Sequence, residues 1–424
     1  MATIAQSVSE LCLAAREASR ALGALDGDAK DAALHAIADA LEERTPDILD
    51  ANARDMDAGR AAGLSPALLD RLALDPERIR GMADGVRTIA SLPDPVGEVI
   101  DGFRLPNGLA AKKVRVPLGV VAVVYEARPN VTIDAAALCL KSGNAIVLRG
   151  SSSAEHSNAV LAEVAAEASE AAGVPAGAIV LVAGGGREEL GELATQAGVV
   201  DLIIPRGGEG LKHALKGVAT VPVIYAASGN CHVFVDASAD LDAAERIIVN
   251  AKTQRPGVCN AAEKLLVHAD AAPAFLPGAL RVLRAKGVEL RVDGRTHALA
   301  GEGLAGELVD ATEEDWDTEF LALVLAVKVV DSVQEAIDHV NAHGSGHSEA
   351  IITESVASAR AFELGVDAAC VYVNASTRFT DGGEFGMGAE IGNSTQKLHA
   401  RGPIGLRELC TFKYVVHGDG QIRP

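Results

Sequence analysis

Residues 145–184 read AIVLRGSSSAEHSNAVLAEVAAEASEAAGVPAGAIVLVAG. Two short apolar runs, 145–150 and 178–184, flank a segment whose apolar residues recur at helical spacing and which stops at a glycine. Continuous apolar runs of this length are typical of strands buried on both faces, and a helix between two such strands is the usual crossover of a parallel pair. The stretch therefore predicts a strand, a helix and a strand in a parallel sheet.

The same alternation extends along most of the chain. Strands are predicted at 199–207 and 221–227, and a second series of strands and helices begins at 232–252 and continues through EAIITES (349–355) and ACVYVNAS (369–376). Repeats of this kind indicate doubly wound α/β sheets, which bind nucleotides beyond the carboxyl ends of their strands. The usual dinucleotide fingerprint is missing, because Gly184, Gly185 and Gly186 lack the third spaced glycine of GxGxxG. A doubly wound sheet that binds no dinucleotide is therefore the alternative.

Two other kinds of segment surround this core. The first ninety or so residues carry apolar positions three and four apart and predict successive amphipathic helices. Residues 97–119 alternate between charged and apolar side chains around an Asn-Gly turn at 107–108, which predicts a hairpin that leaves the body. The strand-like tail, 411–424, is expected to pair with this arm in another subunit, so we expect a homo-oligomer.

The composition excludes several classes of function. A net charge of −20 and a pI near 5.0 argue against binding nucleic acid or an anionic membrane surface. The six cysteines have neither metal-ligand spacing nor a disulfide pattern, so no metal site is expected. The N-terminus lacks signal-peptide character and no long apolar stretch occurs, which predicts a soluble cytoplasmic protein with a small-molecule substrate.

One cysteine stands out by its context. Cys259 lies in KTQRPGVCNAAEKLLV (252–267), between an Arg-Pro-Gly turn and a run that we interpret as a helix beginning near Asn260. A helix start favours thiolate over thiol and can hold a developing oxyanion, so this position suits a nucleophile. The alternative is that Cys259 is a small buried hydrophobic residue, as most free cysteines are.

The order of these features resembles the aldehyde dehydrogenase superfamily. The motifs that carry the resemblance span nearly the whole chain: RPN (128–130), RGS (149–151), PRGG (205–208), ASGN (227–230), the Cys259 loop and TEF (318–320). The resemblance implies an aldehyde dehydrogenase-like α/β fold with two doubly wound domains and an oligomerisation arm. The implied boundaries are 1–96 and 120–230 for an NADPH-binding domain, 231–402 for a catalytic domain, and 97–119 with 403–424 for the oligomerisation strands.

The resemblance also implies roles for individual residues. Cys259 would be the nucleophile, and Asn130 would donate its side-chain amide to the oxyanion. The cofactor contacts would be Arg149, Ser151, Arg206, Gly207, Gly208, Glu319 and Phe320. Arg149 stands where the superfamily usually has a lysine, and a guanidinium there suits the 2′-phosphate of NADPH (NADP+).

The longer motifs at 253–261, 371–392 and 395–406 narrow the resemblance to the branch that reduces L-glutamyl 5-phosphate to L-glutamate 5-semialdehyde in proline biosynthesis. Arg128 or Arg255 would hold the phosphate, and Ser376 and Thr377 would hold the α-carboxylate. Arg255 as a brace of the Cys259 loop and Arg128 as a brace between domains are the alternatives. A transient contact with glutamate 5-kinase, which supplies the labile substrate, is also expected.

One departure from the superfamily concerns the fate of the thioester. Hydrolytic members carry a glutamate that activates water, and Ala227 stands in its place here. A thioacyl enzyme that water attacks slowly can wait for hydride, which favours reduction of the acyl phosphate. Another acylating dehydrogenase, for example one that uses coenzyme A, and a catalytically silent member of the fold are the alternatives.

Overall fold

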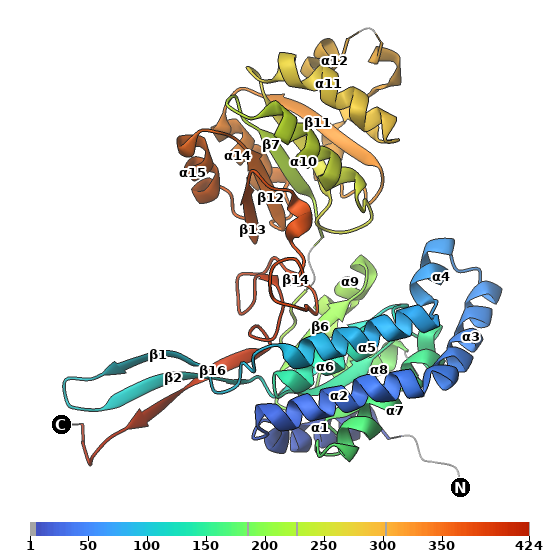
Figure 1. Ribbon diagram of the computed structural model, residues 1–424, viewed down its shortest axis with the longest axis vertical. Coiled ribbons are helices and arrows are strands. Elements are labelled where there is room, and N and C mark those ends of the chain that lie inside the picture. Colours follow the sequence, from blue (N-terminus) through green and yellow to red (C-terminus); the bar gives the residue numbers. More distant parts are fainter. Residues whose placement is uncertain (1–5, 185, 226–227, 302, 424) are drawn as a thin grey trace. The chain divides into compact units, whose positions relative to one another are not determined.

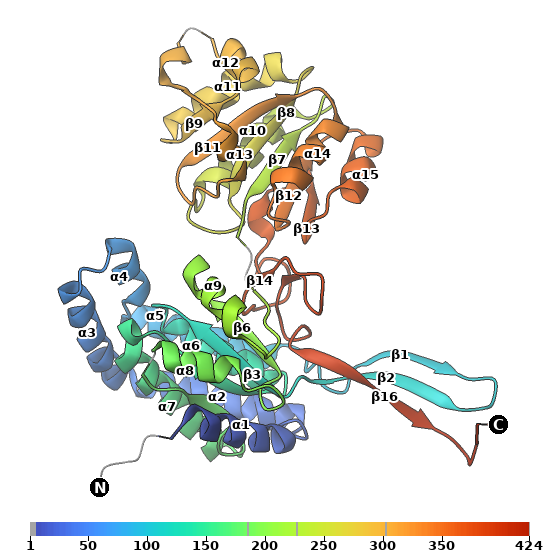
Figure 2. The same cartoon turned by 180° about the vertical axis from the view of Figure 1, so that it is seen from behind.

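The computed structural model describes residues 6–184, 186–225, 228–301 and 303–423. The chain divides into two compact units (Figures 1 and 2). The first unit comprises Met1–Tyr225, Gly386–Gly392 and Ile404–Pro424, and the second comprises Ala226–Phe385 and Asn393–Pro403. Each unit contains one open parallel sheet, so the predicted α/β fold class is confirmed.

The sheet of the first unit has four parallel strands in the order β5-β4-β3-β6. These are β3 (Val120–Tyr125), β4 (Ala145–Arg149), β5 (Ile179–Leu181) and β6 (Leu202–Arg206). The predicted strand at 221–227 was wrong, because in its described part only Val223 forms a bridge, to Ile203. Pro222 has no N–H to donate, which prevents a continuous ladder there.

Helices cover both faces of this sheet. Helices α1 (Val8–Leu22), α8 (Arg187–Ala194) and α9 (Glu209–Val218) share a buried apolar cluster with β3 and β4. Helices α6 (Asn130–Lys141) and α7 (Glu155–Ala171), with the short η1 (Ser152–Ala154) before α7, cover the other face (Figure 2).

The predicted helical entry layer is confirmed. It consists of α1 followed by α2 (Gly27–Glu43), α3 (Thr45–Ala61), α4 (Pro66–Leu72) and α5 (Pro76–Ser91). Capping side chains mark where several of these helices begin: Ser7, Asp26, Ser65 and Asp75 each accept a backbone hydrogen bond of the first turn.

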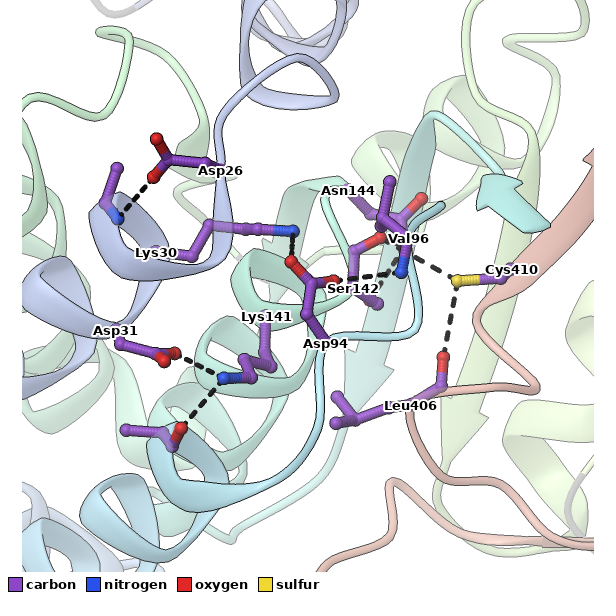
Figure 3. A network of polar contacts seen from close by, with 12 residues as sticks. Asp26, Lys30, Asp31, Asp94, Val96, Lys141, Ser142, Asn144, Leu406 and Cys410 are labelled. Atoms are coloured by element: carbon purple, nitrogen blue, oxygen red, sulfur yellow. Dashed lines mark hydrogen bonds and ion pairs between the residues drawn. The ribbon is translucent and has the colours of Figure 1, made fainter. Parts of the chain in front are cut away.

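Two buried lysines fix α2 to its neighbours (Figure 3). Lys30 Nζ lies 2.5 Å from the Asp94 carboxylate, and Lys141 on α6 pairs with Asp31 on α2 and donates to the Ala90 carbonyl oxygen at 2.8 Å. Each lysine side chain is only 1% exposed. Because a buried charge without a partner is costly, the Lys141 pair fixes α2 against α6, and the Lys30 pair fixes α2 against the segment that follows α5.

The arm is a three-stranded antiparallel sheet in the order β1-β2-β16. Its strands are β1 (Val99–Arg104), β2 (Ala110–Pro117) and β16 (Cys410–His417), and Gly108 in the predicted turn has φ +92°. The hairpin is confirmed. The expectation for the tail was wrong, since β16 pairs along β2 of its own chain (Figure 1).

The second unit has a seven-stranded parallel sheet in the order β10-β9-β11-β8-β7-β12-β13. One face is covered by α10, α11 and α12, and the other by α14 and α15. The strands are β7 (Cys231–Val235), β8 (Ala262–His268), β9 (Glu289–Val292), β10 (Val309–Asp310), β11 (Val324–Val330), β12 (Ser348–Ile352) and β13 (Cys370–Val373).

The helices of this unit are α10 (Leu241–Thr253), α11 (Ala272–Ala285), α12 (Gly294–Leu299), α13 (Glu313–Asp317), α14 (Val333–His343) and α15 (Val356–Gly365). The short elements are η2 (Ala305–Glu307), η3 (Thr377–Phe379), β14 (Asn393–Ser394) and β15 (Gly402–Pro403). Across both units, none of the described helices is long and apolar enough to cross a bilayer.

The predicted helix near Asn260 was wrong. Cys259 and Asn260 form a turn, and the chain then enters β8 at Ala262. Strand β8 lies between β7 and β11 and is buried on both faces. Its sequence looks amphipathic because Glu263 and Lys264 are charged, yet both residues are fully buried.

Candidate active site

Cys259 differs from the other cysteines in exposure. All six cysteines lie in the described part of the chain, and Cys259 alone is not buried. Burial raises the pKa of Cys12 to about 11 and that of Cys410 to about 12, and it raises the pKa of Cys139 and Cys231 well above the ordinary value. A buried thiol is a poor nucleophile, so the geometry favours Cys259.

The backbone of Cys259 is held from two sides. Cys231, the first residue of β7, donates its Sγ hydrogen to the Cys259 carbonyl oxygen at 3.1 Å. Gly229 packs so closely that a Cβ there would lie 1.5 Å from the same oxygen. The Gly229 N–H donates to Glu319 Oε1 at 2.6 Å. Gly229 thus contacts both the backbone of Cys259 and the carboxylate of Glu319, the residue that the resemblance assigns to the cofactor.

Asn260 anchors the other end of the Cys259 turn. Its Nδ2 donates to the carbonyl oxygens of Arg378 (3.3 Å) and Thr380 (3.0 Å), and Arg378 Nη1 donates to its Oδ1. The Thr377 hydroxyl donates to the Asn260 carbonyl oxygen at 2.7 Å. These contacts come from η3 and the loop after it, more than a hundred residues away in sequence.

This arrangement revises one expected substrate contact. Thr377 is fully buried and its hydroxyl is engaged by Asn260, so it supports the Cys259 loop rather than an α-carboxylate. Ser376 is 5% exposed and accepts a hydrogen bond from the Arg378 N–H. Arg255 is exposed, five residues before Asn260. Burial lowers the pKa of the partly buried Arg378, and the charge of Arg255 adds to this effect.

The segment that carries Glu319 and Phe320 is fixed by two neighbouring residues of β8. Lys264 Nζ donates to the Thr318 carbonyl oxygen at 2.8 Å and lies 4.6 Å from the centre of the Phe320 ring. Glu263 accepts the Leu321 N–H at 3.3 Å, where Leu321 has a left-handed φ of +52°. Burial lowers the pKa of Lys264 to about 8.

In the first unit, Asn130 is the first residue of α6 and is exposed. Its Nδ2 donates to Asp134 Oδ2 at 3.0 Å, one turn further along the helix. Burial raises the pKa of Asp134 to about 6, although the Asn130 hydrogen bond and the nearby Arg206 oppose the shift. Arg128 is partly buried just before α6 and accepts the Val131 N–H with its carbonyl oxygen.

The predicted cofactor residues of the first unit lie at the carboxyl ends of β4 and β6. Arg149 ends β4, is 7% exposed and donates from Nη2 to the Gly186 carbonyl oxygen at 2.5 Å. The Ser151 hydroxyl accepts the Ala127 N–H at 3.3 Å. Arg206 ends β6 and is followed by Gly207 and Gly208.

The two glycines differ in the space around them. A Cβ on Gly207 would lie 2.7 Å from the Glu126 carboxyl carbon, whereas a Cβ on Gly208 would meet nothing within 4 Å. Gly208 precedes α9, and no side chain caps this helix. The Gly208 N–H donates to Glu126 Oε2 at 3.1 Å, so the pyrophosphate of a dinucleotide would meet the N–H groups that follow Gly208 in the first turn.

The sequence-predicted residues thus fall into two sets. Cys259, Glu319, Phe320, Ser376 and Thr377 gather around one turn of the second unit, and Arg255 lies just before that turn. Asn130, Arg128, Arg149, Ser151, Arg206, Gly207 and Gly208 follow the strands of the first unit. Ala227 lies outside the described residues.

Sequence reasoning missed Asp134, Gln254, Lys264 and Arg378. Asp134 alone had a local signal, its spacing of four from Asn130 in the sequence. Within the described residues, no cluster of three or more histidine, cysteine, aspartate or glutamate side chains suits a metal ion.

Comparison with known proteins places these features in context. Residues 2–298 and 283–415 match the model of the aldehyde dehydrogenase family. The chain is 56% identical to the gamma-glutamyl phosphate reductase of Thermobifida fusca over the full length of both chains. It is 57% identical to that of Heliobacterium modesticaldum over 96% of this chain and 97% of the relative.

A solved structure is similar to this chain along nearly its whole length. The crystal structure of the gamma-glutamyl phosphate reductase of Thermotoga maritima has 47% sequence identity to this chain and a TM-score of 0.96, covering 99% of this chain and all of the other. The similarity therefore extends through both units and the arm.

Proposed function

The chain belongs to the aldehyde dehydrogenase family, and from this premise we propose that it reduces L-glutamyl 5-phosphate to L-glutamate 5-semialdehyde with NADPH. The observation that carries the proposal is the identity of 56% over the full length to a chain named gamma-glutamyl phosphate reductase. The partly exposed Cys259 supplies the nucleophile that this reaction needs.

The reaction proceeds in three steps at Cys259. The thiolate attacks the carbonyl carbon of the acyl phosphate, the carbon–oxygen bond to phosphate breaks, and a thioester forms with release of inorganic phosphate. The hydride that converts this thioester into a thiohemiacetal comes from NADPH when it is bound. Loss of the thiolate from the thiohemiacetal then releases the aldehyde and restores Cys259.

Oxyanion stabilisation is assigned to Asn130 and the Cys259 N–H. A preorganised donor of this type contributes about 3 kcal/mol to the transition state. The hydrogen bond from Nδ2 to Asp134 supports the role of Asn130, because it fixes the amide plane and still leaves one N–H for the substrate.

The cofactor is assigned to the strand ends of the first unit and to Glu319 and Phe320. The start of α9 is assigned to the pyrophosphate through the N–H groups that follow Gly208, whose own N–H donates to Glu126, with Arg206 and Gly207 beside it. Arg149 and Ser151, at the end of β4, are assigned to the adenosine side, where the Arg149 guanidinium favours a 2′-phosphate. Glu319 and Phe320 are assigned to the nicotinamide riboside.

The substrate phosphate is assigned to Arg255 or Arg128, because a guanidinium binds phosphate oxygens in pairs. Ser376 remains the candidate for a hydroxyl contact with the α-carboxylate, whereas Thr377 is reassigned to the support of Asn260.

The proposal predicts phosphate-dependent reduction of NADP+ by glutamate 5-semialdehyde in the reverse direction. An acylating dehydrogenase that uses coenzyme A would show this activity with coenzyme A in place of phosphate. A catalytically silent member would show neither, and its Cys259 would not be alkylated faster than a buried cysteine. All six cysteines are free thiols, which is the state expected in a reducing cytoplasm.

Assembly is assigned to the arm. Large apolar side chains are exposed on the two outer strands, β1 and β16, among them Phe103 (48%), Phe412 (46%), Tyr414 (57%) and Val416 (52%). The three strands carry five basic residues (Arg104, Lys112, Lys113, Arg115 and Lys413) against one acidic residue, Asp101, on a chain of net charge −20. This apolar and basic surface complements a second acidic copy of the chain.

Light scattering tests this assignment, and the double variant Phe412→Ser/Tyr414→Ser is expected to lower the measured mass to that of one chain. An unchanged mass would place the interface elsewhere.

Because acyl phosphates are labile, transient contact with glutamate 5-kinase completes the proposal, and cross-linking of the two purified enzymes during turnover tests it.

A further inference from the structure

The second unit contains a cavity of about 230 Å3, and none of the residues assigned above to catalysis, the cofactor or the substrate lines it. It lies between the end of α10 and the loop that follows β13. Its walls are formed by Asn250, Gln254, Arg378, Phe379, Asp381 and Glu384.

The cavity adjoins the Cys259 turn through Arg378. Arg378 Nη1 donates to Oδ1 of Asn260, the residue after Cys259, and Nε donates to Gln254 Oε1 at 2.8 Å. Burial and the charge of Arg255 lower the pKa of Arg378, whereas Asp381 and Cys259 act in the opposite direction. The guanidinium therefore lies within electrostatic range of the thiol.

The positive charge of Arg378 is not neutralised by these contacts. Both of its acceptors are neutral amide oxygens, and in the described part of the chain its Nη2 has no acceptor. A partly buried guanidinium with unused donors is a strong site for a carboxylate, because it binds the two oxygens in a fixed plane.

The other walls of the cavity have complementary properties. Asp381 and Glu384 are exposed carboxylates, and Oδ1 of Asp381 accepts a local hydrogen bond from the Gly383 N–H at 3.0 Å. The Phe379 side chain is 49% exposed and offers an apolar surface between the cation and the carboxylates. A cation, an apolar surface and two anions match a zwitterionic α-amino acid with a short aliphatic chain.

We propose that this cavity binds the α-amino acid end of the substrate, with Arg378 in place of Ser376 on the α-carboxylate, Glu384 and Asp381 on the α-ammonium, and Phe379 against the methylene groups. The inference rests on the proposed function and extends it from chemistry to specificity. In a glutamyl group, two methylenes separate the reacting carbonyl carbon from the α-carbon. Arg378 donates to the side chain of Asn260, the residue after Cys259, so the proposed anchor belongs to the same turn as the nucleophile.

The binding test uses L-norvaline, which has the carbon chain and the zwitterion of the semialdehyde but no reactive carbonyl. Calorimetry is expected to show that Glu384→Gln and Arg378→Lys each weaken norvaline binding at least tenfold. Pentanoate, which lacks the ammonium group, should respond to Arg378→Lys and not to Glu384→Gln. The matched controls Glu363→Gln and Arg360→Gln, on the exposed surface of α15, should bind norvaline within twofold of the wild type.

Equal norvaline affinities in wild type, Glu384→Gln and Arg378→Lys, or no binding to the wild type, would overturn the proposal. Because Glu384 is exposed, its variant is expected to fold, so the test does not depend on the more buried Arg378.

Kinetics separate this proposal from the proposed function. In the reverse reaction, Glu384→Gln should lower the ratio of kcat/KM for glutamate 5-semialdehyde to that for butanal at least tenfold. An unchanged ratio in an active enzyme would contradict the amino-acid cavity alone. A wild type without phosphate-dependent activity on the semialdehyde would contradict the proposed function, and norvaline binding would still decide the cavity.

Discussion

Gly229 lies against the backbone of Cys259, such that a Cβ on Gly229 would be 1.5 Å from the Cys259 carbonyl oxygen and 2.5 Å from its Cα. The same glycine donates its N–H to the Glu319 carboxylate. The loop of the nucleophile and the carboxylate assigned to the cofactor therefore meet at a residue that only glycine can occupy without displacement.

We predict that Gly229→Ala lowers kcat at least about 100-fold, because a misplacement of about 1 Å at a reacting atom is enough for such a loss. The rate of Cys259 alkylation by iodoacetamide should change as well. Gly257→Ala is the matched control, since its Cβ would lie 3.7 Å from the nearest atom, the Leu321 carbonyl oxygen. Equal losses in both variants would mean that the close contact at Gly229 has no special role.

A second prediction concerns Asp134 and pH. Burial raises the pKa of Asp134 to about 6, so the carboxylate that accepts the Asn130 hydrogen bond becomes protonated as the pH falls through this value. A neutral acid is a weaker acceptor, and the Asn130 amide is then held less firmly. We expect the kcat of the wild type to fall below about pH 6, and Asp134→Asn to remove this inflection while lowering kcat at higher pH. The same inflection in Asp134→Asn would assign it to another group.

The sequence predicted the parts of the fold that depend on periodicity and turns. The apolar runs of β4, β5 and β6 and the Asn-Gly turn of the arm are local signals, and each corresponds to an observed element. Strand β8 was missed because Glu263 and Lys264 mimic the polar face of a helix. Their charges are tolerated inside the unit because Glu263 pairs with Lys252 at 3.0 Å and Lys264 binds a carbonyl oxygen.

The candidate site was predictable only in part, for a related reason. Cys259 stands out in its own segment, whereas the roles of Thr377 and Arg378 depend on contacts with Asn260, more than a hundred residues earlier in the chain. No sequence pattern records such a contact. Side chains that serve the same loop were therefore assigned to the substrate, and the cavity beside them was not anticipated.

A third prediction tests the cofactor preference. Arg149→Ala is expected to raise the KM for NADP+ at least tenfold and the KM for NAD+ less than threefold, because only NADP+ carries the phosphate assigned to this guanidinium. Arg20→Ala, which removes an exposed arginine from α1, is the control. Parallel changes in both KM values would show that Arg149 acts on the fold or on a part common to the two cofactors.

A fourth prediction addresses the buried Lys252–Glu263 pair, in which both side chains are fully buried. Removing one partner leaves an uncompensated charge, so Lys252→Met is expected to lower the free energy of unfolding by about 3–5 kcal/mol in urea titrations. The double variant Lys252→Met/Glu263→Leu should recover most of this loss. Additive losses in the double variant would show that the pair itself is not what stabilises β8 against α10.

The most direct test of the account measures the first turnover without phosphate. Glutamate 5-semialdehyde and NADP+ are mixed with the enzyme, and NADPH absorbance is followed together with the mass of the Cys259 peptide. Because Ala227 stands at the position that the sequence resemblance assigns to a water-activating glutamate, we predict about one NADPH per active site, a glutamyl thioester on Cys259, and resumed turnover when phosphate is added. Continuous NADPH formation without phosphate, or a thioester on a different cysteine, would contradict the account.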